Sequence, residues 1–291
     1  MTACADPVTV PVDAILELTR TLVAIPSQAG IDSSGPMLIA IARFLDANGL
    51  KPRMLSDVDG SPVALITEII GAGDGPTICL NACGDTAPAG DPATWASPPF
   101  EPTEREGWLF GRGAADSKVA IATFCHLAVS LAGRRDQLAG RLLLLFDCDE
   151  HTGGFGGVKA LLRRKPDLAG VMIGYPNDSA ITVGARGFYR SQVVVHGRAE
   201  HSGNPRGPTA NAIEKAAHLA VALQATDLPE IDDLEFPLPP KISVTAIRGG
   251  LGYSVIPDHC ELNVDFRLTP AAGRSWAEVA TQPPEPKGKQ E

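Results

Sequence analysis

The sequence lacks the features that direct a protein to nucleic acid or to a membrane. It has no cluster of basic residues, and its formal net charge is -9 over 291 residues, which disfavours nucleic acid and anionic membrane surfaces as the main partner. No apolar run approaches the ~20 residues that span a bilayer. Residues 1–10 contain no basic region followed by an apolar core, as a secretory leader would. The sequence predicts a cytoplasmic protein with no nucleic-acid or membrane partner.

Regular cysteine spacing is also absent. The six cysteines are Cys4, Cys79, Cys83, Cys125, Cys148 and Cys260. Most of them stand inside apolar runs, so we expect buried free thiols rather than a disulfide framework. Hydrophobic residues make up 44% of the chain, which is long enough for one large domain or two smaller domains with separate cores.

Helical and strand-like segments alternate along the first part of the chain. Apolar residues at helical spacing predict helices at residues 12–23, 36–48, 117–132 and 156–164. Apolar or β-branched runs predict strands at 62–70, 77–82, 140–147 and 170–174, and the unbroken leucines at 142–145 indicate a strand buried on both faces. This order predicts an α/β domain with a mostly parallel sheet, whose ligands gather at the carboxyl ends of the strands.

The pattern changes after residue 187. Residues 188–196 alternate like a half-exposed strand, 209–225 read as an amphipathic helix, and 241–248 and 259–268 read as two further strands. Strand, helix, strand, strand is the beginning of a ferredoxin-like α+β unit. Residues 282–291 are rich in Pro, Lys and Glu and are predicted to be a disordered tail.

One acid, Asp116, follows a glycine-rich turn at the start of a predicted helix. The segment from Gly111 to Lys118 reads Gly-Arg-Gly-Ala-Ala-Asp-Ser-Lys. The glycines permit a sharp turn, and the helix that follows fixes the direction of the carboxylate. Asp116 is therefore a candidate metal-bridging carboxylate, and a helix-capping aspartate is the structural alternative.

Two more polar motifs accompany this turn. Leu80 to Asp91 reads Leu-Asn-Ala-Cys-Gly-Asp-Thr-Ala-Pro-Ala-Gly-Asp, and Asp147 to Gly154 reads Asp-Cys-Asp-Glu-His-Thr-Gly-Gly. Together the three motifs resemble those of the di-zinc metallopeptidase and amidohydrolase family of acetylornithine deacetylase, succinyl-diaminopimelate desuccinylase, aminoacylase and carboxypeptidase G. The resemblance covers residues 14–270, and several separate motifs in one order argue against a chance match.

The resemblance implies a hydrolase that splits an amide bond with two zinc ions, bridged by Asp116 and by the water that they activate. Asp85 corresponds to the acid that orients a ligand histidine two residues earlier, but that earlier position holds Cys83. A thiolate binds zinc, so Cys83 is a candidate ligand, with a buried thiol as the alternative. His151 stands at the position of a glutamate ligand and is itself a common zinc donor.

The remaining correspondences concern proton transfer and the substrate. Glu150 corresponds to the general base, although it and His151 have the alternative of being turn residues. His201 corresponds to a lid histidine that stabilises the oxyanion across a dimer, with a surface loop histidine as the alternative. Arg267 corresponds to a lid arginine that grips a substrate carboxylate. Ser254 stands where an asparagine that contacts the substrate is usual.

Two departures from the family pattern affect the metal. Tyr175 stands where an acidic ligand is usual, and a phenol with a pKa of ~10 is a poor ligand at neutral pH. The C-terminal return segment, which carries a final histidine ligand in the family, is not recognisable in the sequence. The resemblance therefore implies one or two zinc ions, with cobalt or manganese as substitutes, held by incomplete ligand sets.

These observations lead to an expected architecture and to competing functions. The architecture is a zinc-hydrolase catalytic domain over residues 1–186 with an inserted lid and dimerisation domain over 187–281, incomplete at the C-terminus. The first functional interpretation is a hydrolase of a small-molecule N-acyl amino acid or peptide, working as a homodimer through the lid. The alternative is a catalytically impaired relative that acts as a ligand-binding or dimerising protein. A third possibility is a truncated product of a longer gene.

Overall fold

The structure is a computed structural model that describes residues 9, 11–175, 180–182, 184–205, 210–228 and 238–269. The chain divides into two compact units, Met1–Ser179 and Ala180–Glu291, and each unit is described by itself. This division falls a few residues before the expected domain boundary after residue 186. The predicted tail at 282–291 and the last part of the predicted second domain, 270–281, lie outside the described residues.

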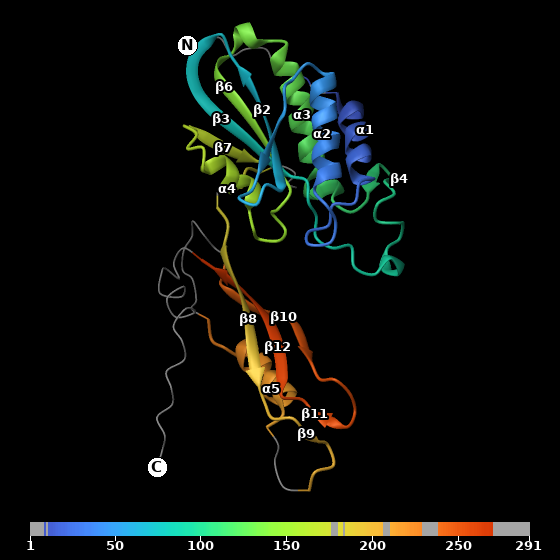
Figure 1. Ribbon diagram of the computed structural model, residues 1–291. Coiled ribbons are helices and arrows are strands. Elements are labelled where there is room, and N and C mark those ends of the chain that lie inside the picture. The colour runs from blue at the N-terminus through green and yellow to red at the C-terminus, as the bar shows by residue number, and fades with distance from the viewer. Residues whose placement is uncertain are drawn as a thin grey trace. The chain divides into compact units, whose positions relative to one another are not determined.

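A five-stranded sheet forms the centre of the first unit (Figure 1). In spatial order its strands are β1 (Arg53–Ser56), β2 (Pro62–Ile70), β6 (Ala139–Asp147), β3 (Gly73–Cys83) and β7 (Gly170–Ile173). β3 pairs in parallel with both β6 and β7, whereas β2 pairs antiparallel with both β1 and β6. Four of these five strands therefore run in one direction and β2 runs against them. The sheet is mixed, with the predicted parallel arrangement in its β6, β3 and β7 part.

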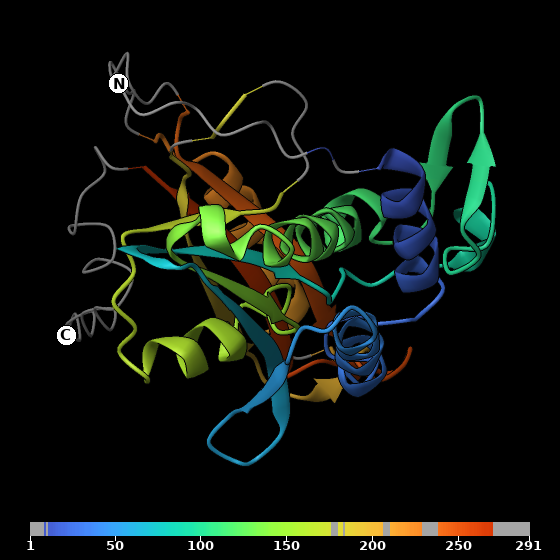
Figure 2. The ribbon, with the colours of Figure 1, turned by 90° about the horizontal axis from the view of Figure 1, so that it is seen from above.

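Helices cover both faces of this sheet (Figure 1, Figure 2). Helices α1 (Val12–Val23), α2 (Gly35–Ala47) and α3 (Val119–Ala132) pack on one face, and α4 (Gly156–Leu162) packs on the other. In β6, Leu144 and Phe146 belong to the core beneath α1, α2 and α3. Leu143 and Leu145 belong to the core beneath α4. Burial on both faces explains why this strand is a continuous apolar run.

Shorter elements surround the sheet. They are the helical turns η1 (Pro92–Thr94), η2 (Ala114–Lys118) and η3 (Arg135–Gln137) and the hairpin strands β4 (Thr103–Arg105) and β5 (Trp108–Phe110). Figure 2 shows this hairpin beyond α1. An ion pair between Arg20 of α1 and Glu104 of β4 joins the two elements.

The helix α3 and the turn before it form the most apolar helical segment. Among the described residues, Ala114–Ala132 is the one helical segment whose length and composition would suffice to cross a membrane. Its residues Ile121, Ala122, Phe124, Cys125 and Ala128 are buried in the core of the first unit. Its apolar character is therefore that of a central core helix.

The second unit is a three-stranded antiparallel sheet with one helix. Its elements are β8 (Gly187–His196), α5 (Ala212–Gln224), β10 (Lys241–Gly249) and β12 (His259–Leu268), with spatial strand order β10, β12, β8, and a separate pair formed by β9 (Glu200–His201) and β11 (Val255–Ile256). The α5 helix packs on one face of the sheet through Ala212 and Ala216, against Leu262 and Val264. The predicted strand, helix, strand, strand order of a ferredoxin-like unit is confirmed.

The cysteine prediction also holds in the described residues. Cys79, Cys83, Cys125, Cys148 and Cys260 are buried free thiols. Cys4 lies outside the described residues. Four of the five are in the core clusters of the two units, where a thiol behaves as a small apolar side chain.

Candidate metal centre

The candidate site lies where two parallel strands end together. In the β3 and β6 pairing, Cys83 stands opposite Asp147, and the backbone N–H of Gly84 donates to the Asp147 carbonyl at 2.7 Å. The segments that follow these two strands carry Asp85 on one side and Glu150 and His151 on the other. The sheet topology therefore gathers the side chains at the carboxyl edge of the strands, as the sequence predicted.

Asp85 fixes the loop that carries Glu150 and His151. Its side chain is buried, with the residue only 3% exposed. One carboxylate oxygen accepts the backbone N–H of Glu150 at 3.2 Å, and the other accepts the backbone N–H of His151 at 2.8 Å. Asp85 thus organises two neighbouring residues through their backbone, and its Oδ2 also lies 3.5 Å from the imidazole Nδ1 of His151.

Asp116 follows a tight turn that only a glycine at position 113 can form. Gly113 has a φ of 82°, and a Cβ at this position would lie 2.5 Å from Cγ2 of Thr86. A side chain there would therefore be excluded by both backbone conformation and space. After this turn, Lys118 is fully buried and its Nζ donates to the carbonyl of Ile25 at 2.9 Å. Burial lowers the pKa of Lys118 to about 8.

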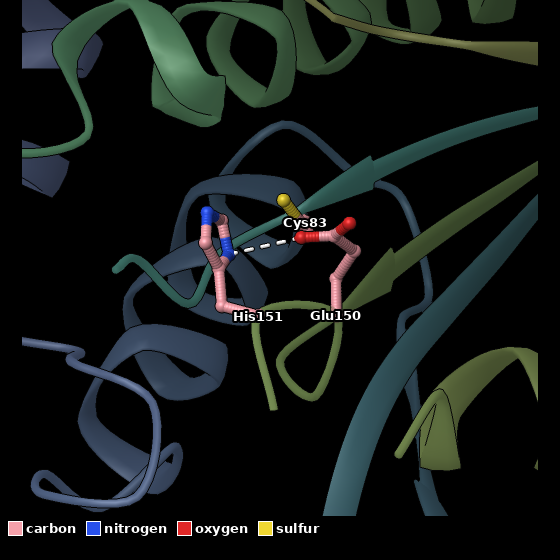
Figure 3. Close-up of side chains that lie close together, drawn as sticks. All are labelled: Cys83, Glu150 and His151. Atoms are coloured by element: carbon pink, nitrogen blue, oxygen red, sulfur yellow. Dashed lines mark ion pairs between the residues drawn. The ribbon is translucent and has the colours of Figure 1, made fainter. Parts of the chain in front are cut away.

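Three side chains converge closely enough to share one cation (Figure 3). The Cys83 Sγ, a Glu150 carboxylate oxygen and a His151 ring nitrogen all lie within 4.8 Å of one another. His151 Nδ1 lies 3.1 Å from Glu150 Oε2, and the opposite ring nitrogen, Nε2, lies 3.7 Å from Asp116 Oδ2. Glu150, which the sequence suggested as a base, thus belongs to the tightest cluster, and Asp116 approaches from the other side of the imidazole.

The charges in this cluster favour a protonated imidazole while no cation is bound. The carboxylates of Asp116 and then Asp85 raise the pKa of His151 to about 12. The contact with His151, followed by that with Tyr175, lowers the pKa of Asp116 despite its partial burial. Burial raises the pKa of the Cys83 thiol. A metal ion would therefore have to displace protons from both His151 and Cys83, because ligands bind metal in their deprotonated forms.

Five buried side-chain atoms of the described residues lack a hydrogen-bond partner, and two of the five belong to this site. They are Asp116 Oδ1 and His151 Nδ1; the Glu150 carboxylate is near the latter but outside hydrogen-bonding geometry. Buried polar atoms without partners are few in native proteins and call for a ligand, an ion or a water. The sulfur, nitrogen and oxygen donors present here match the preferences of zinc. The residues therefore fit a metal ion.

Two further residues reach the site: Tyr175, which the sequence placed at the position of a ligand, and Ser117, which the sequence did not assign to the site. The Tyr175 hydroxyl donates to Asp116 Oδ2 at 3.1 Å, although the sequence suggested only a lost ligand at that position. The Ser117 hydroxyl lies 3.1 Å from Cys83 Sγ and is buried. Its position directly after Asp116 was the available signal, but a serine at the start of a helix is more often read as a capping residue.

The remaining predicted site residues belong to the second unit. His201 in β9 stands opposite Val255 in β11, and the neighbouring Ser202 N–H donates to the Ser254 carbonyl at 3.0 Å, so His201 and Ser254 are brought together. Arg267 is not brought to them. Arg267 lies eight residues from His259 along β12. His259 pairs with His196, at the end of β8 that leads into β9. At about 3.3 Å per residue, this separates Arg267 from that end by roughly 26 Å.

A stability prediction follows from a buried acid beside the site. Asp147 is 2% exposed, and burial raises its pKa to about 7 from 3.8. The folded state therefore binds more protons than the unfolded chain between these values, and the free energy of unfolding falls as the pH rises from about 4 to about 7. Asp147→Asn lacks this titrating group, so its free energy of unfolding should not fall in this way. The free energy of unfolding of the variant, relative to that of the parent, should therefore increase by about 2–3 kcal/mol as the pH rises from 5 to 8.

Urea unfolding at both pH values measures this gain. The amide oxygen of the variant can still accept from Asn81 Nδ2, which donates to Asp147 at 3.3 Å. Asp136→Asn, at an exposed position, is the matched control and should show no such gain. Equal pH dependence in both variants would contradict the assignment of the effect to Asp147.

Comparison with known proteins points to one family. Residues 183–279 match the peptidase dimerisation domain of the M20 family. The chain is also 29% identical over 274 residues to the succinyl-diaminopimelate desuccinylase of Paracoccus denitrificans. This alignment covers 90% of this chain and 69% of that protein. These matches support the M20 family of metal-dependent hydrolases as the family that this chain resembles.

Solved structures, two of them from the M20 family, share the fold described above. Human carnosine dipeptidase 1 aligns with a TM-score of 0.69 at 18% identity, over 92% of this chain and 72% of that chain. The M20 family metallo-carboxypeptidase Sso-CP2 of Sulfolobus solfataricus gives a TM-score of 0.69 at 16% identity, over 91% and 74%. A dinuclear metal binding peptidase of Bacillus subtilis from the M20 family gives 0.59 at 18% identity, over 91% and 67%. Identities this low establish the common fold alone.

Proposed function

We propose that the protein is a metal-dependent hydrolase that cleaves the amide bond of an N-acyl amino acid or a small peptide, with zinc as its metal and a cytoplasmic location. The observation that carries the proposal is the convergence of Cys83, Glu150 and His151 within 4.8 Å, beside Asp116, at the carboxyl edge of the sheet. The similar proteins include a desuccinylase and a carnosine dipeptidase, which supports amide bonds as the substrate class.

The residues of the centre have distinct tasks in this proposal. When bound, a zinc ion polarises the substrate carbonyl and makes a water more acidic. Glu150 accepts the proton of the attacking water on its carboxylate and passes it to the nitrogen of the leaving amine, which completes the hydrolysis. Cys83, His151 and Asp116 would hold the ion. Asp85 keeps Glu150 and His151 in place through their backbone N–H groups.

The second unit supplies substrate contacts and the dimer interface in this proposal. His201 would stabilise the oxyanion, Ser254 would contact the substrate, and Arg267 would bind a substrate carboxylate. Because Arg267 lies roughly 26 Å along β12 from the end that leads to His201, one small substrate cannot touch both within one protomer. A homodimer in which one protomer supplies His201 and the other supplies Arg267 removes this conflict. The match of residues 183–279 to a peptidase dimerisation domain supports it.

One observation favours the alternative of a catalytically impaired binding protein. Tyr175 occupies a position where the family resemblance leads us to expect an acid, and its hydroxyl donates a hydrogen bond to Asp116. If the ion is held too weakly at the working concentration, the chain would bind a substrate-like ligand without turning it over. Metal content and turnover distinguish the two functions directly.

The decisive experiment measures both quantities on the full chain. Purified protein, loaded with zinc, is assayed against N-succinyl and N-acetyl amino acids and against dipeptides, with metal per chain determined by elemental analysis. We expect turnover that a chelator abolishes and that added zinc restores, in a species that sediments as a dimer at micromolar concentration. Bound zinc without turnover of any of these substrates would favour the binding protein.

A further inference from the structure

Tyr175 reaches the metal centre from a strand that carries none of the other site residues. It lies two residues beyond β7, which pairs in parallel with β3, the strand that ends in Cys83. Gly174 anchors this point, because its N–H donates to the Asn81 carbonyl at 2.8 Å and a Cβ there would lie 2.6 Å from Ala120 of α3. The backbone before Tyr175 is therefore fixed between β3 and α3, and its side chain starts from a defined place.

The hydroxyl of Tyr175, rather than its ring, is what the site engages. The residue is 58% exposed, so the ring contributes little to a core. The hydroxyl nevertheless donates to Asp116 Oδ2 at 3.1 Å. A tyrosine that is mostly in solvent but makes a hydrogen bond to a site carboxylate points to a role for that hydrogen bond.

The two oxygens of Asp116 have different surroundings as a result. Oδ2 accepts from Tyr175 and lies 3.7 Å from His151 Nε2. Oδ1 is buried and has no hydrogen-bond partner. A buried oxygen without a partner carries the full cost of its lost hydration, so Oδ1 is the atom that is left for a cation.

A hydrogen bond at Oδ2 is incompatible with a cation at the same lone pair. The donated hydrogen stands about 2 Å from the oxygen that accepts it. Zinc also binds carboxylate oxygens at about 2.0–2.2 Å. A bridging carboxylate offers one oxygen to each of two ions, and here the hydroxyl proton takes one of the two lone pairs of Oδ2, so that a second ion would have to share this oxygen with it.

We propose that Tyr175 is a positioning residue that makes this centre mononuclear. Its hydroxyl holds Asp116 Oδ2 and leaves Oδ1 as the single oxygen that Asp116 gives to one ion, which Cys83 and His151 also bind. The inference rests on the proposed metal-dependent function. It sets this chain apart from the Bacillus subtilis relative, which is a dinuclear metal binding peptidase.

The test compares the parent with Tyr175→Phe, which removes the hydroxyl and keeps the exposed ring. Zinc titration calorimetry gives the stoichiometry and affinity, and the visible absorption of the cobalt-loaded protein reports the coordination of the ion. We expect one ion per chain in the parent. In the variant the first ion should bind roughly tenfold or more weakly, the usual cost of losing a group that orients a ligand, and a second ion should bind at higher zinc concentration, because no hydroxyl then occupies Asp116 Oδ2. The cobalt absorption should shift, because the freed carboxylate can give both oxygens to the ion.

Tyr189→Phe is the matched control. It removes the same atom from β8 in the second unit and should change neither the affinity nor the spectrum. Equal thermal unfolding midpoints of the parent and Tyr175→Phe verify that the fold is intact.

The remaining results separate the inference about Tyr175 from the proposed hydrolase function. Two ions bound per chain of the parent would show that Asp116 bridges, and would overturn the inference. An unchanged affinity and an unchanged cobalt spectrum in Tyr175→Phe would overturn it as well, without touching the proposed hydrolase. A shifted spectrum in a protein whose parent hydrolyses no amide would support the inference and contradict the proposed function. Absence of metal binding by the parent would overturn both.

Discussion

Glu150→Gln should lower the rate of amide hydrolysis by about a hundredfold or more, the usual contribution of a positioned general base. Glutamine preserves the size of the side chain but cannot accept the proton of the attacking water. The metal should stay bound, because Cys83, His151 and Asp116 are unchanged. Steady-state kinetics with N-acyl amino acids, together with metal per chain, measures both effects.

The location of Glu150 makes the metal measurement essential. Its carboxylate lies 3.1 Å from His151 Nδ1 and belongs to the same cluster as Cys83 Sγ. Glu101→Gln, at an exposed position, is the control and should leave rate and metal content as they are. If Glu150→Gln loses its metal together with its activity, Glu150 is a ligand rather than the proton carrier. An unaltered rate would remove it from the mechanism.

Cys83→Ala should weaken zinc binding by roughly a hundredfold or more, because it removes a donor from the ion itself and even groups that only orient donors are worth about 10–100-fold. The cobalt-loaded parent should show a sulfur-to-metal charge-transfer band that the variant lacks. Calorimetric titration and absorption spectroscopy give the two measurements.

Cys79→Ala separates this effect from the loss of any buried thiol. Cys79 and Cys83 lie on the same strand, four residues apart, and both are buried. Both substitutions create a small cavity, which lowers stability in either variant. Only Cys83→Ala should change metal binding. An equal zinc affinity in the two variants would make Cys83 a buried thiol without a metal role, the alternative that its sequence context left open.

Most helices and strands could be predicted because their signals are local. The α1 helix begins and ends at the predicted residues, and β6 was recognisable from its leucine run, since a strand buried on both faces needs apolar residues at consecutive positions. The order of β8, α5, β10 and β12 likewise followed from patterns within each segment. The motifs around Asp85 and Glu150 then met at one sheet edge because the parallel strands β3 and β6 end together, and Asp116 reaches them from the turn before α3.

The arrangement inside the site was not predictable in the same way. The family resemblance suggested Asp116 as a ligand shared between ions. The hydrogen bond from Tyr175 to its Oδ2 depends on the β3 and β7 pairing and on the close approach of Gly174 to α3, and neither has a local signal in the sequence. The direction of β2 also had no local signal, because an antiparallel strand buried in a mixed sheet carries the same apolar composition as a parallel one. Such features are set by contacts between distant segments.

The buried Lys118 links the integrity of the metal centre to the folding of the whole first unit. Its ammonium group is bound to the carbonyl of Ile25, just after α1, while its backbone belongs to the turn that carries Asp116. Because Lys118 is fully buried, exposing this ammonium to water requires the turn to move away from the segment after α1, so we expect the centre to come apart by a sub-global opening rather than by local fluctuation of one loop. An ion that binds the folded unit and not the unfolded chain also shifts the unfolding equilibrium. At a hundred times its dissociation constant it would stabilise the folded unit by about 2.7 kcal/mol. Metal supply would then regulate the lifetime of the protein as well as its activity.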